Sequence, residues 1–258
     1  MSFIKDSDFL IEVAKGNVKN HSLITVLGRN KDVDTSIVDI GMLDINFIWP
    51  TVATTYVALS NDPTDSILDT GARKILIEGL DSNFDPISEE VEMNGTSEST
   101  ATTASFIRIN KTRVIATGTY ATTLLGANNG NIIIGPSGGG SPLSYIANVE
   151  IDPGASQDCK YTVPNGYTAI VLGVGANIDS TKTGTLVINL REGADIVTAP
   201  FTSKIATVNV AGFAGLHTVP RELLNFKILA KTDIWASAKG GVNNTEIEIS
   251  LRLLLIKD

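Results

Sequence analysis

The stretch TGARKILIEGLDSNFDPISEEVEMNGT, residues Thr70–Thr96, predicts two strands joined by a turn. Arg73–Glu78 and Ile87–Met93 each alternate in polarity, which places successive side chains on opposite faces of a strand. Between them, Gly79–Pro86 concentrates residues that tolerate a left-handed backbone or pre-set a turn. Asn94-Gly95, a strong hairpin signal, closes the unit. We therefore expect a hairpin with one mostly apolar face and one acidic, solvated face.

Length and cysteine content limit the chemistry that the chain can carry. Its 258 residues could form one large β domain or two ordinary ones, with enough apolar surface to bury a core. Cys159 is the single cysteine, so no disulfide can form within the chain, and we expect it to act as a small buried hydrophobic residue. The two histidines, His21 and His217, lie far from each other and from any nucleophile motif. These residues cannot supply a zinc site of the usual spacing, and we predict no metal and no cofactor.

The charge balance argues against a nucleic-acid partner. The chain has 28 Asp and Glu against 20 Lys and Arg, a formal net charge of −8, whereas proteins that coat nucleic acid carry a basic patch. The first residues, MSFIKDSDF, do not have the apolar core of a signal peptide. No apolar run approaches the roughly 18–20 residues that cross a membrane. We expect synthesis in a cytoplasm and no membrane partner.

The second half of the chain predicts many short strands separated by turns. Turn signals such as Asn165-Gly166 and Gly240-Gly241 punctuate it at regular spacing. Eight strands with inward and outward alternation fit a jelly roll. The predicted strands are Ala147–Ile151, Cys159–Val163, Thr168–Asn177, Gly184–Glu192, Ala206–Val210, Leu223–Leu229, Thr232–Lys239 and Thr245–Ile256.

These patterns predict an all-β protein with two β-rich domains, the C-terminal one a jelly-roll-like antiparallel sandwich. Ser7–Ala14 could form a short helix, or the start of the chain could be an arm that lies on a neighbour. The Gly- and Pro-rich Gly135–Pro142 is the clearest break in composition and suggests a linker. The predicted boundaries are an N-terminal arm at 1–20, an N-terminal β domain at 21–135, a linker at 136–146 and a C-terminal β-sandwich domain at 147–258.

Several motifs resemble chemical sites but do not have their context. Gly135–Pro142 has no Lys-Ser/Thr pair and no following helix, so it is not a phosphate loop. Gly173–Ile178 does not have the third glycine and the βαβ setting of a dinucleotide site. The paired carboxylates are more simply explained as surface charge, and we predict no catalytic residue and no enzymatic activity. These pairs are Glu89 with Glu90, Asp62 with Asp65, and Asp81 with Asp85.

Aromatic and apolar residues suggest contacts rather than chemistry. Trp49, Tyr56, Tyr161, Tyr167 and Trp235 could line a sugar-binding face, but large aromatics in a β-rich chain more often lie in the core. The C-terminal run at 253–256 is apolar on both faces, so it is either central in a sheet or covered by a neighbouring subunit. The candidate interface residues are Phe3, Ile4, Phe9, Leu10, Trp235, Leu253 and Leu255.

Three segments, taken in order, resemble a family of virion structural proteins of tailed bacteriophages, common in phages of marine and other aquatic bacteria. The first is EVAKGNVKNHSLITVLGRNKDVDTSIVDI at 12–40. The second is the opening stretch at 70–96, followed by FIRINKTRVI at 106–115. The third is YTVPNGYTAIVLGV at 161–174, with the closing LLLIKD. Each segment carries little information by itself, and the ordered set is more specific.

The resemblance implies a non-enzymatic role. The first hypothesis is a capsid decoration (cement) protein on the capsid surface, assembled in the host bacterial cytoplasm. Its partners would be the major capsid protein and further copies of itself, as a dimer or trimer, with the N-terminal arm as a docking segment. The second is a fibre module that binds host surface glycan, and the third is a tail or neck component that contacts other virion proteins. A β-fold hydrolase is the fourth, and no constellation of residues supports it.

Overall fold

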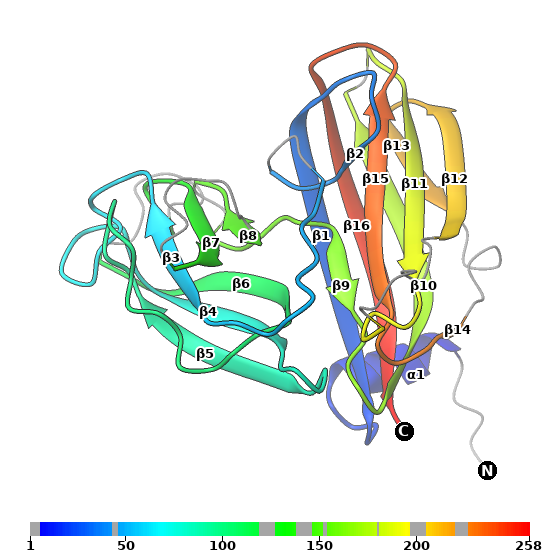
Figure 1. The fold of residues 1–258 in the computed structure, drawn as a ribbon. Helices are drawn as coiled ribbons and strands as arrows, with labels where there is room; N and C mark the ends of the chain where they lie inside the picture. The colour runs from blue at the N-terminus through cyan, green and yellow to red at the C-terminus, as the bar shows by residue number, and fades with distance from the viewer. Residues whose placement is uncertain are drawn as a thin grey trace.

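The computed structural model describes residues 6–42, 46–118, 127–137, 146–151, 154–179, 181–196, 205–219 and 227–258; the side chains of residues 6–8, 205–211 and 213 are not described. These ranges form an all-β protein with one short helix, as the sequence predicts. Figure 1 shows two lobes side by side, a tall sandwich and a smaller lobe. All strand pairings within the sheets are antiparallel.

The tall lobe consists of two facing sheets. The first sheet has the order β1-β16-β10-β13, with β14 also paired to β10. The second has the order β12-β11-β15-β2, with β9 also paired to β15. The strands are β1 (His21–Val33), β2 (Val38–Asp39), β9 (Lys160–Thr162), β10 (Tyr167–Ile178), β11 (Gly184–Arg191), β12 (Ile205–Phe213), β13 (Leu216–Val219), β14 (Lys227–Ile228), β15 (Asp233–Gly240) and β16 (Thr245–Lys257).

The pairing of these strands is that of a jelly roll. Along the chain of this lobe, the first strand, β1, pairs with the last strand, β16. The next two strands, β2 and β9, both pair with β15. Strand β10 pairs with β13 and β14, and β11 pairs with β12. This nested order is a long antiparallel hairpin folded over on itself into two packed sheets. The predicted fold class is therefore confirmed, but the roll also uses residues from the beginning of the chain.

One strand of the roll is split by the smaller lobe. Val38 and Asp39 lie opposite Ala238 and Ser237, and β9 begins opposite Trp235. Between these pairs, the Ile40 N–H donates to the Ala236 carbonyl at 2.9 Å. Residues 38–40 and 160–162 thus form one edge strand along β15, and the intervening chain is an insertion in that strand.

The insertion contains two three-stranded sheets, with orders β3-β7-β8 and β5-β4-β6. Their facing sides bury apolar residues that include Tyr56, Ile75, Phe106 and Ile132. The opening stretch forms the hairpin β4–β5, with Ile75 and Ile77 buried and Glu90 and Glu92 exposed, as its alternation predicts. The strands are β3 (Tyr56–Ser60), β4 (Ala72–Leu80), β5 (Pro86–Glu92), β6 (Arg108–Thr117), β7 (Ile132–Pro136) and β8 (Ala147–Val149).

The predicted domain boundaries need correction. The range 21–135 combines β1 and β2, which belong to the roll, with strands of the inserted lobe. The predicted linker at 136–146 joins β7 to β8, which pair with each other in one sheet, so it does not separate two domains; residues 138–145 lie outside the described part. Composition shows where the chain turns, but the partner of each strand is set by contacts distant in sequence.

The start of the chain is partly helical. Helix α1 (Asp6–Ala14) confirms the helix predicted at Ser7–Ala14 and packs near the start of β1. Phe9 contacts the His21 ring edge-on, with centroids 5.6 Å apart, and Val13 is buried. Much of the predicted arm at 1–20 is therefore folded against the roll.

Two glycines allow the chain to pass closely at the join between the lobes. A Cβ atom at Gly28 of β1 would lie 2.3 Å from the Cβ of Cys159, where the chain returns to the roll. A Cβ atom at Gly79 of β4 would lie 2.1 Å from the Arg108 carbonyl oxygen. Any larger side chain at either position would push the two segments apart.

Candidate functional site

Buried charges gather where the two lobes meet. Arg108 begins β6 in the inserted lobe, and its guanidinium donates to both carboxylate oxygens of Asp233 on β15, at 2.9 and 3.2 Å. Asp233 is fully buried and Arg108 is 4% exposed. Arg191 of β11 donates from Nε to the same carboxylate at 3.0 Å, and the Thr162 hydroxyl donates to it at 2.6 Å. Asp233 is thus surrounded by donors from both lobes.

The Arg108 guanidinium has further partners. It donates to the Pro50 and Ile107 carbonyls, at 2.6 and 2.9 Å. Its Cζ lies 5.3 Å from the ring centroid of Trp49, which also contacts Arg191, Trp235 and Phe47. Cations held over aromatic rings add to the stability of such a site when it is shielded from water. Removing Asp233 would leave the two guanidinium groups without their carboxylate, and removing Arg108 would leave Asp233 with Arg191 and Thr162 alone.

A second buried group lies beside the first. The Lys160 ammonium donates to the Ile146 carbonyl, lies 3.7 Å from the Asp158 carboxylate and stacks 4.5 Å from the centroid of Phe47. Burial lowers the pKa of Lys160, and the neighbouring Asp158 opposes that shift. Asp39 accepts from the Trp235 indole and the Ser237 hydroxyl, at 2.9 and 2.7 Å. These contacts hold both ends of the insertion to the roll.

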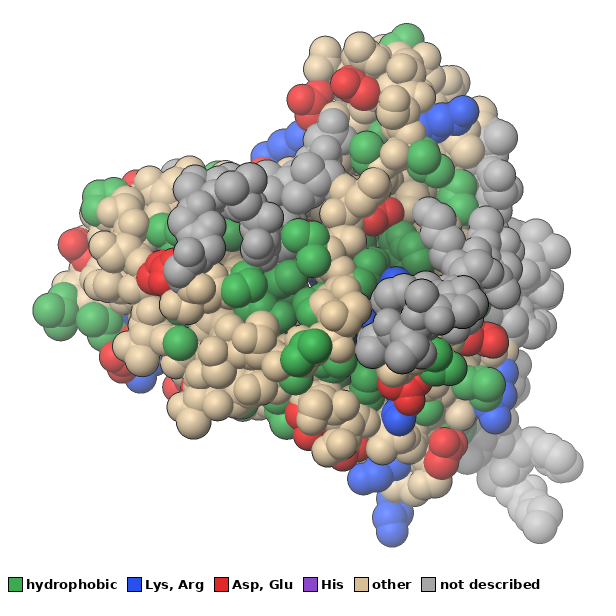
Figure 2. Space-filling view, viewed as in Figure 1, with side chains coloured by type: hydrophobic (Ala, Val, Ile, Leu, Met, Phe, Trp, Pro, Cys, Tyr) green, Lys and Arg blue, Asp and Glu red, His purple; other side chains and the backbone are tan. Residues whose placement is uncertain are grey.

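The backbone of β9 is also paired across the junction. The side-chain amide of Asn110 on β6 donates to the Thr162 carbonyl at 3.0 Å and accepts from the Thr162 N–H at 2.9 Å. This pair of bonds imitates a neighbouring strand. Leu80, Phe84 and Ile107 of the inserted lobe pack with Ala194 of the roll. Figure 2 shows hydrophobic side chains gathered where the lobes meet on this face. Polar and apolar contacts therefore make the two lobes one unit.

The candidate interface residues divide into three groups. Phe3 and Ile4 lie outside the described residues. Phe9 and Leu10 lie on α1 and are half-buried. Trp235, Leu253 and Leu255 are buried in this chain's own interior, so they are not available to a neighbour. Of the two explanations for the apolar C-terminal run, the central position in a sheet is the correct one, because β16 lies between β1 and β10.

Three of the carboxylates that resemble catalytic pairs in the sequence have local structural roles. Asp65 is fully buried and accepts from Ser60, Ala72, Asn129 and Gly130. The Asp81 carboxylate accepts two N–H groups within its own turn, and that of Glu89 accepts the N–H groups of the loop at 103–104.

The remaining candidates also serve the fold. Cys159 is buried, as predicted, and burial raises the pKa of its thiol to about 12. Within the described ranges, no group of three His, Cys, Asp or Glu side chains could hold a metal ion. No helix in the described part of the chain is long and apolar enough to cross a membrane.

Sequence reasoning missed the buried charges at the junction, although a signal is present. Arg108, Lys160 and Asp233 each stand alone in an apolar or aromatic run, within FIRI, CKYT and TDIW. A charge in a strand that is otherwise apolar needs a buried partner of opposite sign. The rule includes the three residues but also Arg252 in SLRLLL, which is exposed, so it neither isolates the junction nor assigns the pairs.

Comparisons with known proteins add little. No family model matches this chain, and no curated protein matches it. Among solved structures, a crystal structure of the infectious bursal disease virus VP2 subviral particle is 9% identical with a TM-score of 0.19, over 98% of this chain and 73% of that chain. The 2.6 Å structure of T=1 particles derived from the same virus is 8% identical with a TM-score of 0.15, over 93% of this chain and 74% of that chain. Similarity at these scores carries no argument about fold or function.

Proposed function

We propose that this chain is a non-enzymatic structural protein of a tailed-phage virion, and specifically a capsid decoration protein that bridges neighbouring subunits of the shell. The observation that carries the proposal is the buried junction of Arg108, Asp233 and Arg191, which joins two lobes into one unit. A bridging protein must hold two contact surfaces at a fixed separation, because a flexible joint would lose binding energy to ordering. Such a protein stabilises the assembled shell by mass action.

The sequence and the fold support the same proposal. The ordered segments at 12–40, 70–96 and 161–174 resemble a family of virion proteins, and jelly rolls occur in viral capsid domains. The fold by itself does not give a function, since jelly rolls also occur in lectins. The major capsid protein is the proposed partner, and self-association as a dimer or trimer would match the local symmetry of a shell.

A fibre module that binds host glycan is the alternative. It needs exposed aromatic rings that can stack on sugars. The five aromatic residues that could line a sugar-binding face are instead buried or half-buried: Trp49, Tyr56, Tyr161, Tyr167 and Trp235. These five residues therefore do not form the exposed aromatic face that glycan binding needs.

Copy number in purified virions tests the proposal. Quantitative mass spectrometry would measure this chain against the major capsid protein of the same particles. We expect hundreds of copies, in a stoichiometric relation to the shell subunit. A few to a few dozen copies would contradict decoration and indicate a vertex, neck, tail or fibre component, and absence from the particle would contradict any virion role.

The docking role of the first residues needs a separate test. Removal of residues 1–5 leaves α1 and its contact with β1 intact, so the roll should still fold. We expect the shortened chain to lose binding to shells that have been stripped of the native protein. Unchanged coating of the shells would show that docking uses another surface.

A further inference from the structure

Among the residues that the structure describes, strand β1 pairs with another strand on one side only. It ends the order of its sheet, paired with β16. Its other edge faces the inserted lobe across a groove of about 620 Å³. The groove runs between residues 22–27 of β1 and the end of the β4–β5 hairpin, which contributes Leu80 and Ile87. An edge of this kind, beside an open groove, is a template for another strand.

The hydrogen-bond pattern identifies the free groups. In an antiparallel pair, alternate residues bond to the partner strand and those between them point their N–H and C=O away. The Lys257 N–H donates to the Asn20 carbonyl at 2.8 Å, which sets the phase so that residues 22, 24 and 26 bond to β16. The N–H and C=O groups of Leu23, Thr25 and Leu27 therefore face the groove.

Arg29 is the next residue whose N–H points to the free side of β1, and it already has a partner there. Arg29 donates its N–H to the Gln157 carbonyl at 3.0 Å, so the returning chain lies along β1 as a strand would. Beyond that point, in the described part of the chain, no strand pairs with the free side of Leu23, Thr25 and Leu27. The groove therefore lies along the same side of β1 on which Arg29 already bonds to the returning chain.

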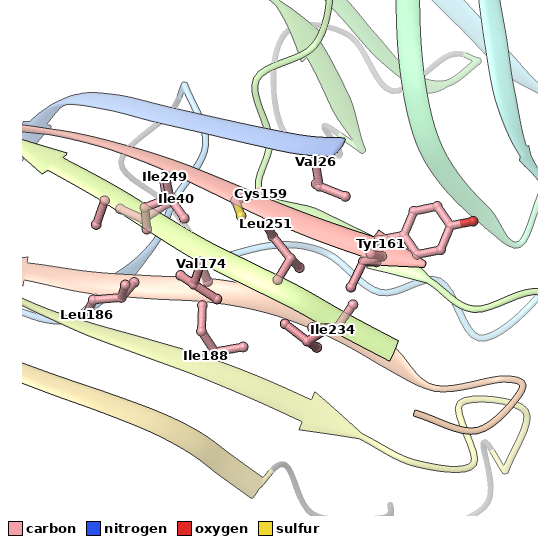
Figure 3. Packing of buried hydrophobic residues seen from close by; sticks show 14 of the residues in the cluster. Val26, Ile40, Cys159, Tyr161, Val174, Leu186, Ile188, Ile234, Ile249 and Leu251 are labelled. Atoms are coloured by element: carbon pink, nitrogen blue, oxygen red, sulfur yellow. The ribbon is translucent and has the colours of Figure 1, made fainter. Parts of the chain in front are cut away.

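The lining of the groove is mixed, with polar residues such as Glu78, Lys111 and Asp158 beside apolar residues that belong to the core of the roll. Ile24 and Val26 point inward and pack with the core of the roll, to which Tyr161 and Leu255 also belong. Figure 3 shows Val26 at the edge of this cluster and the Tyr161 ring extending from it toward the inserted lobe. An aliphatic side chain placed opposite Ile24 or Val26 would extend the core of the roll.

We infer that the free edge of β1 at Leu23–Leu27 is a strand-addition site that takes a short, extended segment of another polypeptide, with aliphatic side chains at alternate positions. Main-chain hydrogen bonds would supply affinity. The apolar residues on the core side of the groove would favour a partner with aliphatic side chains at alternate positions. Four steps of ~3.3 Å give a free edge of ~13 Å. That length suits a short single strand of about five residues. The inference does not depend on the proposed virion role.

The alternative explanation, without a binding function, is that the inserted lobe shields the edge of β1 against aggregation. In that case the groove would exclude peptides as well as whole strands of other molecules. The two explanations differ in a measurable way, because only a binding site would lower amide exchange on the free side of β1 when a peptide is added.

Residue-resolved amide exchange by NMR on the full chain tests the inference. The probe is an acetylated and amidated peptide, Lys-Val-Thr-Val-Thr-Val-Lys. In the free protein we expect fast exchange at Leu23, Thr25 and Leu27 and slow exchange at Ile24 and Val26. The peptide should slow the first set at least tenfold. If millimolar peptide does not slow exchange at Leu23, Thr25 and Leu27, the inference is overturned. If exchange there is slow without peptide and slows further with protein concentration, the edge binds a second copy of this chain and not a peptide.

A matched pair of variants shows where the peptide binds. Thr25 is exposed and its N–H is on the free side, so Thr25→Pro removes the donor without breaking the ladder to β16, and proline is tolerated at such edges. We expect Thr25→Pro to weaken peptide binding at least tenfold by fluorescence polarisation, whereas Thr25→Val, which retains the N–H, binds as the wild type does. Equal binding by both variants would place the peptide elsewhere and overturn the inference.

Discussion

The jelly roll spans its two sheets with strands of up to 13 residues, whereas the longest strand of the inserted lobe has 10. Long strands bury continuous rows of alternating side chains, and the apolar rows of β10 and β16 belong to one core in the roll. The inserted lobe has shorter strands and longer connections, whose backbone groups need partners away from water. Asp65, Ser99 and Thr102 are buried in that lobe. Asp65 accepts N–H groups of the connection at 129–130, and the hydroxyls of Ser99 and Thr102 donate to carbonyls of their own connection and accept N–H groups of β3.

This contrast shows two ways to stabilise antiparallel sheets. Both lobes bury polar side chains, but the roll has the larger apolar cluster. In the inserted lobe, a buried carboxylate and buried hydroxyls also hold the connections, and such groups tolerate little change because an unpaired donor or acceptor costs about 1–3 kcal/mol. The junction combines both, with a buried ion pair beside an apolar cluster. The lobes should therefore respond differently to mutation.

The largest effect should come from removing the inserted lobe. In a variant that joins Ile40 directly to Lys160, the edge strand along β15 keeps its register. We expect a folded roll that unfolds cooperatively by circular dichroism. Its free energy of unfolding should be lower, because the surface that faced the lobe becomes exposed. A variant that joins Ile40 to Tyr161 is the matched control. It slips the register by one residue and turns the following side chains to the wrong face, so it should not fold. Failure of both variants would contradict the split-strand description.

The next effect concerns the junction. Arg108→Met leaves the buried Asp233 carboxylate without its bidentate partner, and we expect a loss of about 3 kcal/mol in the free energy of unfolding. Urea denaturation should then show two transitions, because the lobes are no longer coupled. Arg113→Met on the same strand is the control. It breaks an exposed pair with Glu78, which should cost less than about 1 kcal/mol. Losses of similar size would mean that the junction does not couple the lobes.

The smallest effect should be confined to one lobe. Asp65→Asn replaces one carboxylate oxygen by an amide donor, which then faces either the Gly130 N–H or the N–H groups of Ala72 and Asn129. We expect a loss of about 2 kcal/mol in the free energy of unfolding. Hydrogen exchange should rise in the inserted lobe.

Cys159 labelling serves as the reporter for the roll. Because burial raises the pKa of this thiol to about 12, the native state favours the unreactive protonated form. At pH 8, labelling should therefore require opening of the roll. Faster labelling of Cys159 in the Asp65→Asn variant would show that the lobes are not independent in this respect.

Local sequence determined the strands and turns of this protein. Alternation predicted β4, β5 and most strands of the roll, because side-chain direction in a strand follows from neighbouring residues. Asn165-Gly166 predicted a turn, and Gly166 has a φ of 68°, which glycine adopts without strain. The single cysteine also excluded a disulfide within the chain.

Tertiary structure alone decided how the strands are joined. The pairing of β1 with β16 connects residues more than two hundred positions apart, and no local pattern specifies such a partner. The insertion between Ile40 and Lys160 looks the same in sequence as a domain boundary would, because both are turns between strands. The burial of Trp235 and Leu253 depends on the neighbours that the fold supplies. Strand character is thus a local property of this sequence, whereas pairing, burial and the charged junction arise from contacts between distant segments.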